Sequence, residues 1–277
     1  MTEVFKKIAK ERLTHLERKT EVMHGYVVTQ KVDSKIDPRV VTFHDPNALI
    51  SEQYKTLRTN IQSLIQKRNL KSFVITSAIY GEGKTVTSAN LAFVLAGDLN
   101  AKSILLVDAD LRKGSLSCLL GLGPRPGLSE LLSNGTLLAD TLIDIDFKNL
   151  TILPSGKRPK NPAELLGSAK MKELILELRG KYDVVIFDSP PIMNVTDPGV
   201  LGAQNDGVFV VIQAGRTQRG TLQRAQHLVA QAHVKILGYV MTNVEYHLPE
   251  YIYRYVDGGP YTYYAAPSSI DQNKRER

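Results

Sequence analysis

The chain has 277 residues, 43% hydrophobic and 23% charged, the balance of an ordinary globular protein. That composition excludes a chain disordered throughout and a collagen-like repeat, and a single cysteine cannot form a disulfide scaffold. Lysine and arginine outnumber aspartate and glutamate by 35 to 28, a net charge of +7. This excess favours anionic partners, which could be nucleic acid, a membrane surface or phosphate groups.

Residues 1–45 are predicted to form an N-terminal helical arm and linker. Apolar residues from Val4 to Leu16 recur at helical spacing among lysines and arginines. Such a helix would dock on the protein's own core or, alternatively, on a partner or membrane surface. No apolar run approaches the roughly 20 residues of a membrane span, and no apolar segment follows the first cations as in a secretory signal. A cytoplasmic location is therefore expected.

Residues 46–245 are predicted to form one α/β domain, a doubly wound, mostly parallel sheet with helices on both faces. After a first helix at 46–66, short runs of Val, Ile and Leu alternate with helical stretches. Such near-continuous apolar strands are typical of sheets that helices cover on both faces. The strands are expected at 72–76, 103–107, 150–154, 183–187, 207–212 and 235–241, and the helices near 84–97, 127–133, 161–179, 196–204 and 218–233.

A phosphate-binding loop follows the first of these strands. Residues 78–85 read AIYGEGKT and open directly into a helix, the arrangement of a P-loop. The two glycines let backbone N–H groups point inward, and the helix N-terminus adds partial positive charge. The lysine should reach the outer phosphates and the threonine hydroxyl should bind Mg²⁺. A glycine turn without a ligand is the alternative. The expected nucleotide contacts are Gly81, Glu82, Gly83, Lys84 and Thr85.

Carboxylates stand at the ends of two further predicted strands. Asp108 and Asp110 follow the run ILLV, and Asp188 follows VVIF. Ligands of open α/β sheets bind at the carboxyl ends of the strands, so these side chains are expected to face the P-loop. Each aspartate alone could instead be a helix cap or a turn former. Their convergence with Lys84 and Thr85 favours a nucleotide site.

These segments resemble the bacterial tyrosine kinases (BY-kinases) of capsule and exopolysaccharide synthesis, a branch of the MinD/ParA-like P-loop ATPases. The resemblance implies an ATP- and Mg²⁺-dependent kinase in which Lys84, Asp108 and Asp110 are catalytic. Asp108 would be the base or orienter for the tyrosine hydroxyl, Thr85, Asp110 and Asp188 would hold Mg²⁺, and Asn243 would contact adenine. The resemblance to this family rests on the segments AIYGEGKT (78–85), DADLR (108–112), DSPP (188–191), PGLSELL (126–132) and LPSGKRPKNPAELL (153–166).

The chain departs from the family pattern at two places. Tyr80 stands where the loop usually has proline, and the first arginine of the E-x-x-R-x-x-R packing helix is Lys55. That helix, SEQYKTLRTNI (51–61), implies a homo-oligomeric ring held by Glu52, Lys55 and Arg58. Lysine lacks the bidentate fork of arginine, so weaker ring contacts are expected.

Seven of the twelve tyrosines fall between residues 246 and 264, inside a C-terminal tail at 246–277. An edge strand and an aromatic interaction tail are alternatives, although proline and the Gly258-Gly259-Pro260 break argue against a long strand. Because it follows a kinase domain that resembles this family, the tyrosine cluster resembles the family's autophosphorylation substrate. The implied acceptors are Tyr251, Tyr253, Tyr255, Tyr261, Tyr263 and Tyr264.

The predicted function is therefore a tyrosine autokinase that phosphorylates its tail in trans and regulates exopolysaccharide or capsule polymerisation and export. The resemblance implies recruitment to the inner face of the membrane by a polysaccharide co-polymerase adaptor. No nucleic-acid partner is expected. Neither H-R-D nor D-F-G occurs, which excludes a eukaryotic-type kinase.

The alternatives are a MinD/ParA-like ATPase that positions cargo on membrane or DNA, and an ATP-binding scaffold without turnover. The second lysine usual early in partition-ATPase loops is absent at Ala78-Ile79, which favours the kinase.

Overall fold

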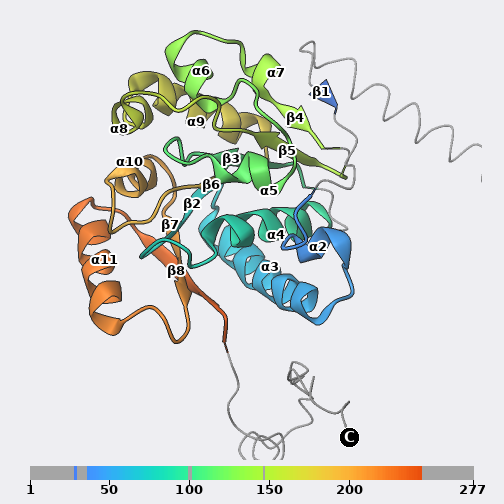
Figure 1. Ribbon diagram of the computed structural model, residues 1–277, viewed down its shortest axis with the longest axis vertical. Helices are drawn as coiled ribbons and strands as arrows, with labels where there is room; N and C mark the ends of the chain where they lie inside the picture. The colour runs from blue at the N-terminus through green and yellow to red at the C-terminus, as the bar shows by residue number, and fades with distance from the viewer. Residues whose placement is uncertain (1–27, 30–35, 99–101, 146, 245–277) are drawn as a thin grey trace, which may run out of the picture.

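The part of the chain that the structure describes is organised by an eight-stranded sheet in the order β1-β4-β5-β3-β6-β2-β7-β8 (Figure 1). This computed structural model describes residues 28–29, 36–98, 102–145 and 147–244. Neighbouring strands run parallel except β4 and β5, which run antiparallel. The mostly parallel sheet predicted from the sequence is confirmed. The strands are β1 (Val28–Thr29), β2 (Ser72–Ser77), β3 (Ile104–Asp108), β4 (Ile143–Asp144), β5 (Leu150–Leu153), β6 (Val184–Asp188), β7 (Val208–Gln213) and β8 (Ile236–Thr242).

Helices cover both faces of this sheet. Successive strand residues point to opposite sides, so strands that are apolar throughout need helices on both faces to bury their side chains. Phe73 and Ile75 of β2 belong to the core beneath α3 and α4, whereas Val74 belongs to the core beneath α9, α10 and α11. The doubly wound prediction is confirmed. The helices are α2 (Val41–His44), α3 (Leu49–Arg68), α4 (Lys84–Ala96), α5 (Ser115–Leu119), α6 (Leu128–Ser133), α7 (Leu138–Thr141), α8 (Pro162–Leu166), α9 (Ala169–Lys181), α10 (Asp197–Gln204) and α11 (Arg219–Gln231).

One predicted helix is two helices in the structure. The stretch 161–179 divides into α8 and α9, with Gly167 and Ser168 between them. Gly167 ends α8, and the Ser168 hydroxyl accepts a hydrogen bond from the Met171 N–H, capping α9. An uninterrupted helix would leave this capping serine without its role, so the sequence already contained the signal for the break.

Residues 36–45, assigned to the arm by the sequence, pack into the domain. Ile36 and Val40 are buried in the core, and Thr42 in α2 bonds to Asn90 of α4. The arm prediction is therefore wrong for this segment. Its few apolar residues are isolated, so they show no periodic spacing that would predict their burial in the core. The remainder of 1–35, apart from β1, lies outside the described residues.

The contact between α2 and α4 depends on hydrogen bonds of Asn90, whose side chain is fully buried. Its Oδ1 accepts from the Thr42 N–H and hydroxyl, and its Nδ2 donates to the Arg39 and Val86 carbonyls. We expect Asn90→Ala to lower the free energy of unfolding by about 3 kcal/mol, because it leaves buried hydrogen-bond donors and acceptors without partners. Urea denaturation checks this, with exposed Asn60→Ala as the control. Equal stability of the two variants would contradict it.

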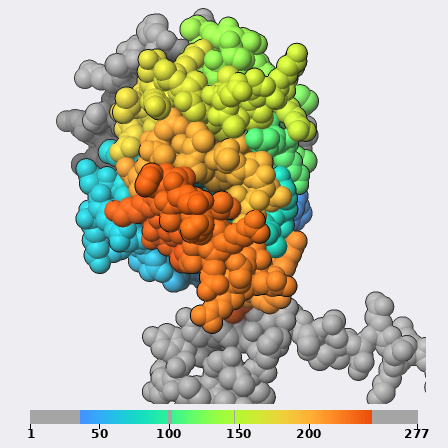
Figure 2. Space-filling model, turned by 90° about the vertical axis from the view of Figure 1, so that its left-hand side faces the viewer, coloured from blue at the N-terminus to red at the C-terminus, as the bar shows by residue number. Residues whose placement is uncertain are grey.

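Strand β8 ends the sheet on the side of α11, and the orange and red surface of this region faces the viewer in Figure 2. It carries two of the exposed large apolar side chains, Tyr239 and Met241. Beyond Val244 the tail with its predicted acceptor tyrosines lies outside the described residues. None of the described helices combines the length and apolar character that crossing a bilayer requires.

Candidate active site

The loop between β2 and α4 has the backbone shape of a phosphate-binding loop. Gly81 and Gly83 take left-handed φ values of +82° and +89°, which any other residue would adopt only with strain. A Cβ at Gly81 would also lie 2.7 Å from Nη1 of Arg216, whose flexible guanidinium would have to shift. The loop then opens directly into α4 at Lys84, so the N-terminus of that helix faces the same space.

Four predicted side chains converge at this loop. The Lys84 Nζ lies 3.2 Å from Oδ2 of Asp110 and 3.8 Å from Oδ2 of Asp188. The Thr85 hydroxyl donates to Asp188 at 2.7 Å, and Ser88, which the sequence analysis did not single out, donates to it at 3.0 Å. Burial would lower the pKa of Lys84, but the Asp188 and Asp110 carboxylates raise it overall, so the ammonium stays charged.

Asp108 lies beside this group and is fully buried. Its two carboxylate oxygens accept the N–H groups of Asp110 and Leu116 at 3.2 and 3.1 Å. Burial, reinforced by the charges of Asp188 and Asp110, raises the pKa of Asp108 well above its ordinary value. The observed contacts make Asp108 the residue that shapes the loop carrying Asp110.

The charge of this cluster suits a bound cation. Three buried carboxylates share one lysine, so a further positive charge would relieve their repulsion. Among the described residues, no three His, Cys, Asp or Glu side chains form a complete metal site. Mg²⁺ needs no such cage, because it typically keeps water and takes one or two carboxylates together with substrate phosphates. Asp110, Asp188 and Thr85 fit that requirement.

The side chain of Glu82 holds the loop in place rather than facing the phosphate site. Its carboxylate is buried and accepts the Ile79 N–H at 2.8 Å and the Thr217 hydroxyl. The carboxylate thus joins the loop to the segment after β7, and the backbone carbonyl of Glu82 joins it to the end of β8 by accepting the Thr242 hydroxyl at 3.0 Å. Its backbone N–H can still serve phosphate, but the carboxylate points into the protein.

Two arginines near the site were missed by the sequence analysis. Arg216 donates to the Gly81 carbonyl at 3.0 Å. Arg112 makes two hydrogen bonds, of 2.8 and 2.9 Å, to the buried carboxylate of Asp197 at the start of α10. Arg216 thus joins the loops after β7 and β2, and Arg112 joins the loop after β3 to α10. Of the two arginines, only Arg112 had a sequence signal, as the last residue of the DADLR motif.

Comparison with known proteins places this site in a family. A family model described as an AAA domain matches residues 49–236. Tyrosine-protein kinase YwqD of Bacillus subtilis is 42% identical over 75% of this chain and 87% of its own length. The putative tyrosine-protein kinase CapB of Staphylococcus aureus is 34% identical over 77% of this chain and 92% of its own. The chain belongs to the bacterial tyrosine-protein kinases.

Solved structures agree with this membership. The kinase domain of Escherichia coli tyrosine kinase ETK superposes with a TM-score of 0.71 at 27% identity, over 78% of this chain and 86% of that one. The septum site-determining protein MinD of Pyrococcus horikoshii gives a TM-score of 0.53 at 25% identity, covering 66% and 76%. Kinase relatives thus match more closely than the partition ATPases, and the tyrosine-kinase prediction is confirmed over its MinD-like alternative.

Other predicted residues of this tyrosine kinase lie around the site or away from it. Asn243 is exposed just after β8, with φ of +56°, and follows Thr242, which contacts the P-loop. On α3, Lys55 pairs with Glu52 at 2.6 Å, while Arg58 donates to the Val94 carbonyl of α4 at 3.3 Å. The α3 residues therefore form no part of the carboxylate cluster.

Proposed function

We propose that this tyrosine kinase transfers the γ-phosphoryl group of ATP to tyrosines in the tail of a neighbouring copy. The observation that carries the proposal is the convergence of Lys84, Asp110 and Asp188 at a glycine-shaped loop on the carboxyl edge of the sheet. The tail at 246–277 supplies clustered acceptors in the same chain. The catalytic unit is proposed to span 46–245 together with the packed segment 36–45.

The side chains divide the work of phosphoryl transfer, which needs positioning and charge neutralisation more than covalent chemistry. Lys84 would leave Asp110 to bind the outer phosphates, and the N–H groups of 81–85 would surround them. Mg²⁺, held by Thr85, Asp110 and Asp188, would neutralise charge on the phosphates. Asp108 would orient the acceptor hydroxyl and take its proton.

Mixing two proteins tests the proposed transfer in trans. Full-length Lys84→Met supplies an acceptor tail without activity, and an active protein ending at residue 245 supplies a site without acceptors. With Mg-ATP, phosphotyrosine should appear on the full-length variant. Phosphate release without phosphotyrosine would instead support the MinD/ParA-like alternative, and neither product would support an ATP-binding scaffold.

We propose that Glu52, Lys55 and Arg58 on α3 hold the subunits of a ring together. They lie three residues apart and share one side of the helix. Arg58 donates to the Val94 carbonyl of α4 but is only half-buried, so part of its side chain remains accessible to a neighbouring subunit.

Charge reversal by Arg58→Glu is expected to shift the mass measured by light scattering towards monomer. The exposed Lys67→Glu, at the end of the same helix, is the matched control and should leave the mass unchanged. If Arg58→Glu lowers the melting temperature but not the mass, the residue serves only its contact with α4.

We further propose that the kinase acts in exopolysaccharide or capsule polymerisation and export, at the inner face of the membrane through a co-polymerase adaptor. The family resemblance and the net charge of +7, suited to an anionic surface, support this. Chain recovered in the membrane fraction only when the adaptor is co-expressed would agree with it. Equal recovery without the adaptor would contradict it.

A further inference from the structure

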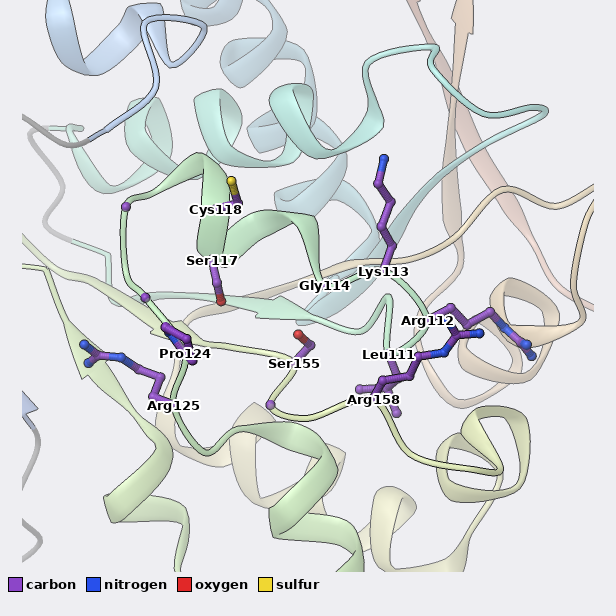
Figure 3. A pocket seen from close by; sticks show the side chains of 13 residues that line it. Leu111, Arg112, Lys113, Gly114, Ser117, Cys118, Pro124, Arg125, Ser155 and Arg158 are labelled. Atoms are coloured by element: carbon purple, nitrogen blue, oxygen red, sulfur yellow. The ribbon is translucent and has the colours of Figure 1, made fainter.

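A cavity of about 530 Å³ lies directly beside the Asp110 loop. Its walls come from residues that follow β3, beginning at Leu111, and from residues that follow β5, such as Ser155 (Figure 3). In the sheet order β5-β3-β6-β2, the P-loop follows β2, so the cavity and the P-loop flank the end of β3 from opposite sides. The cavity is therefore next to the expected position of the acceptor hydroxyl.

The lining of this cavity is strongly basic. It includes four cationic side chains and no acidic one. The charge of Arg112 is already matched by Asp197, whereas Lys113 and Arg158 form no ion pair within the described residues. Uncompensated positive charge in a concave site favours an anionic ligand. The four cations are Arg112, Lys113, Arg125 and Arg158.

The cavity also offers neutral hydrogen-bond donors. In the view of Figure 3, the hydroxyls of Ser117 and Ser155 lie between Arg125 at one edge and Arg158 at the other. The Ser155 residue is only 5% exposed. Guanidinium and hydroxyl donors together are the usual partners of a phosphate group. The volume also exceeds what an inorganic ion alone would need, since ligand pockets of roughly 300–1,000 Å³ hold small organic molecules.

We propose that this cavity binds a phosphotyrosine of the neighbouring copy's tail while the next tyrosine enters the active site. The inference rests on the proposed function, because it takes the product of that reaction as the ligand. The binding step itself makes and breaks no covalent bond. A bound phosphotyrosine would carry about −1.5 to −2 charges into a basic site.

The spacing of the acceptors fits two adjacent sites. Tyr251, Tyr253 and Tyr255 are two residues apart, as are Tyr261 and Tyr263. In an extended peptide such residues face the same side at a separation of about 6.6 Å. Neighbouring strand ends are about 4.8 Å apart, so one peptide can present adjacent tyrosines to the end of β3 and to the cavity beyond it. The first phosphorylation would then promote the second.

Intact-mass spectrometry of the full-length protein during reaction with Mg-ATP tests this order. Wild type should pass quickly from the unphosphorylated form to multiply phosphorylated forms. Arg158→Ala should accumulate the singly phosphorylated form, with the second transfer slowed about 10-fold by loss of a charge-assisted contact. Lys160→Ala, an exposed cation of the same loop outside the cavity lining, is the matched control and should behave as wild type.

A tail with one tyrosine separates this effect from general damage. When every tail tyrosine except Tyr253 is changed to Phe, Arg158→Ala and wild type should phosphorylate it at equal rates. Equal slowing on the single-tyrosine and complete tails would overturn the proposal, because Arg158 would then serve the first transfer. Unchanged phosphorylation of both tails would overturn it as well.

Cys118 provides a readout that does not depend on catalysis. It lines the cavity, is exposed and is the one cysteine of the sequence. Phenyl phosphate should slow its alkylation by iodoacetamide at concentrations where phenol does not, and Arg158→Ala should need about 10-fold more phenyl phosphate. A kinase that makes phosphotyrosine but leaves Cys118 unprotected overturns the cavity proposal alone. Wild type without any phosphotyrosine overturns the proposed function and this proposal with it.

Discussion

Replacing Lys84 with methionine is expected to lower phosphotyrosine formation by at least about a thousandfold, the scale on which a single cation acts in phosphoryl transfer. Methionine keeps the length of the side chain but removes the ammonium that lies between Asp110 and Asp188. The outer phosphates would then meet buried carboxylates without a compensating lysine. Immunodetection of phosphotyrosine after incubation with Mg-ATP measures the loss.

The exposed Lys67→Met is the matched control, because it removes the same charge far from the loop. Circular dichroism separates lost chemistry from lost structure. Because the lysine contacts buried carboxylates, some loss of thermal stability is expected with it, but a folded variant should remain. Substantial autophosphorylation by folded Lys84→Met would contradict the assignment of the loop.

Asp110→Asn and Asp188→Asn are each expected to lower the transfer rate about 10²- to 10³-fold and to raise the Mg²⁺ concentration needed for half-maximal activity. Asparagine preserves size but removes the charge that would hold the cation. In Asp188→Asn the new amide group would also face the hydroxyls of Thr85 and Ser88, which now donate to the carboxylate. Titrating Mg²⁺ at saturating ATP measures both effects.

Asp140→Asn, an exposed aspartate of α7, is the control for these substitutions. A variant with full activity and unchanged Mg²⁺ dependence would remove that carboxylate from the proposed site. Asp108→Asn should differ in kind. Its carboxylate accepts two backbone N–H groups, so the variant should unfold at a lower temperature as well as react slowly.

The sequence predicted the carboxylate cluster because parallel strands impose it. Lys84 and Asp110 follow β2 and β3, and Asp188 is the last residue of β6. Because these parallel strands end at the same edge of the sheet, the convergence of the three side chains needs no knowledge of loop conformation. The strands themselves were predictable from continuous apolar runs. The two-residue strands β1 and β4 were not, because such short pairings leave no periodic signal.

Contacts between loops escaped prediction. Glu82 was expected at the nucleotide, but its carboxylate is taken by Ile79 and by Thr217, which is 135 residues away in the chain. Arg158 and Lys113 meet at one cavity only because the turns after β5 and β3 bring them there. Neither pairing follows from residue type or spacing, since both depend on the path of irregular backbone.

The hydrogen bond from Thr242 to the Glu82 carbonyl has a mechanical consequence. Thr242 is the last residue of β8, four residues before the tyrosine-rich tail begins at 246, and Glu82 lies in the middle of the phosphate-binding loop. A displacement of either partner stretches the same bond. A force that pulls on Thr242 would therefore also pull on Glu82 in the phosphate-binding loop, and a movement of that loop would displace the end of β8 from which the tail continues.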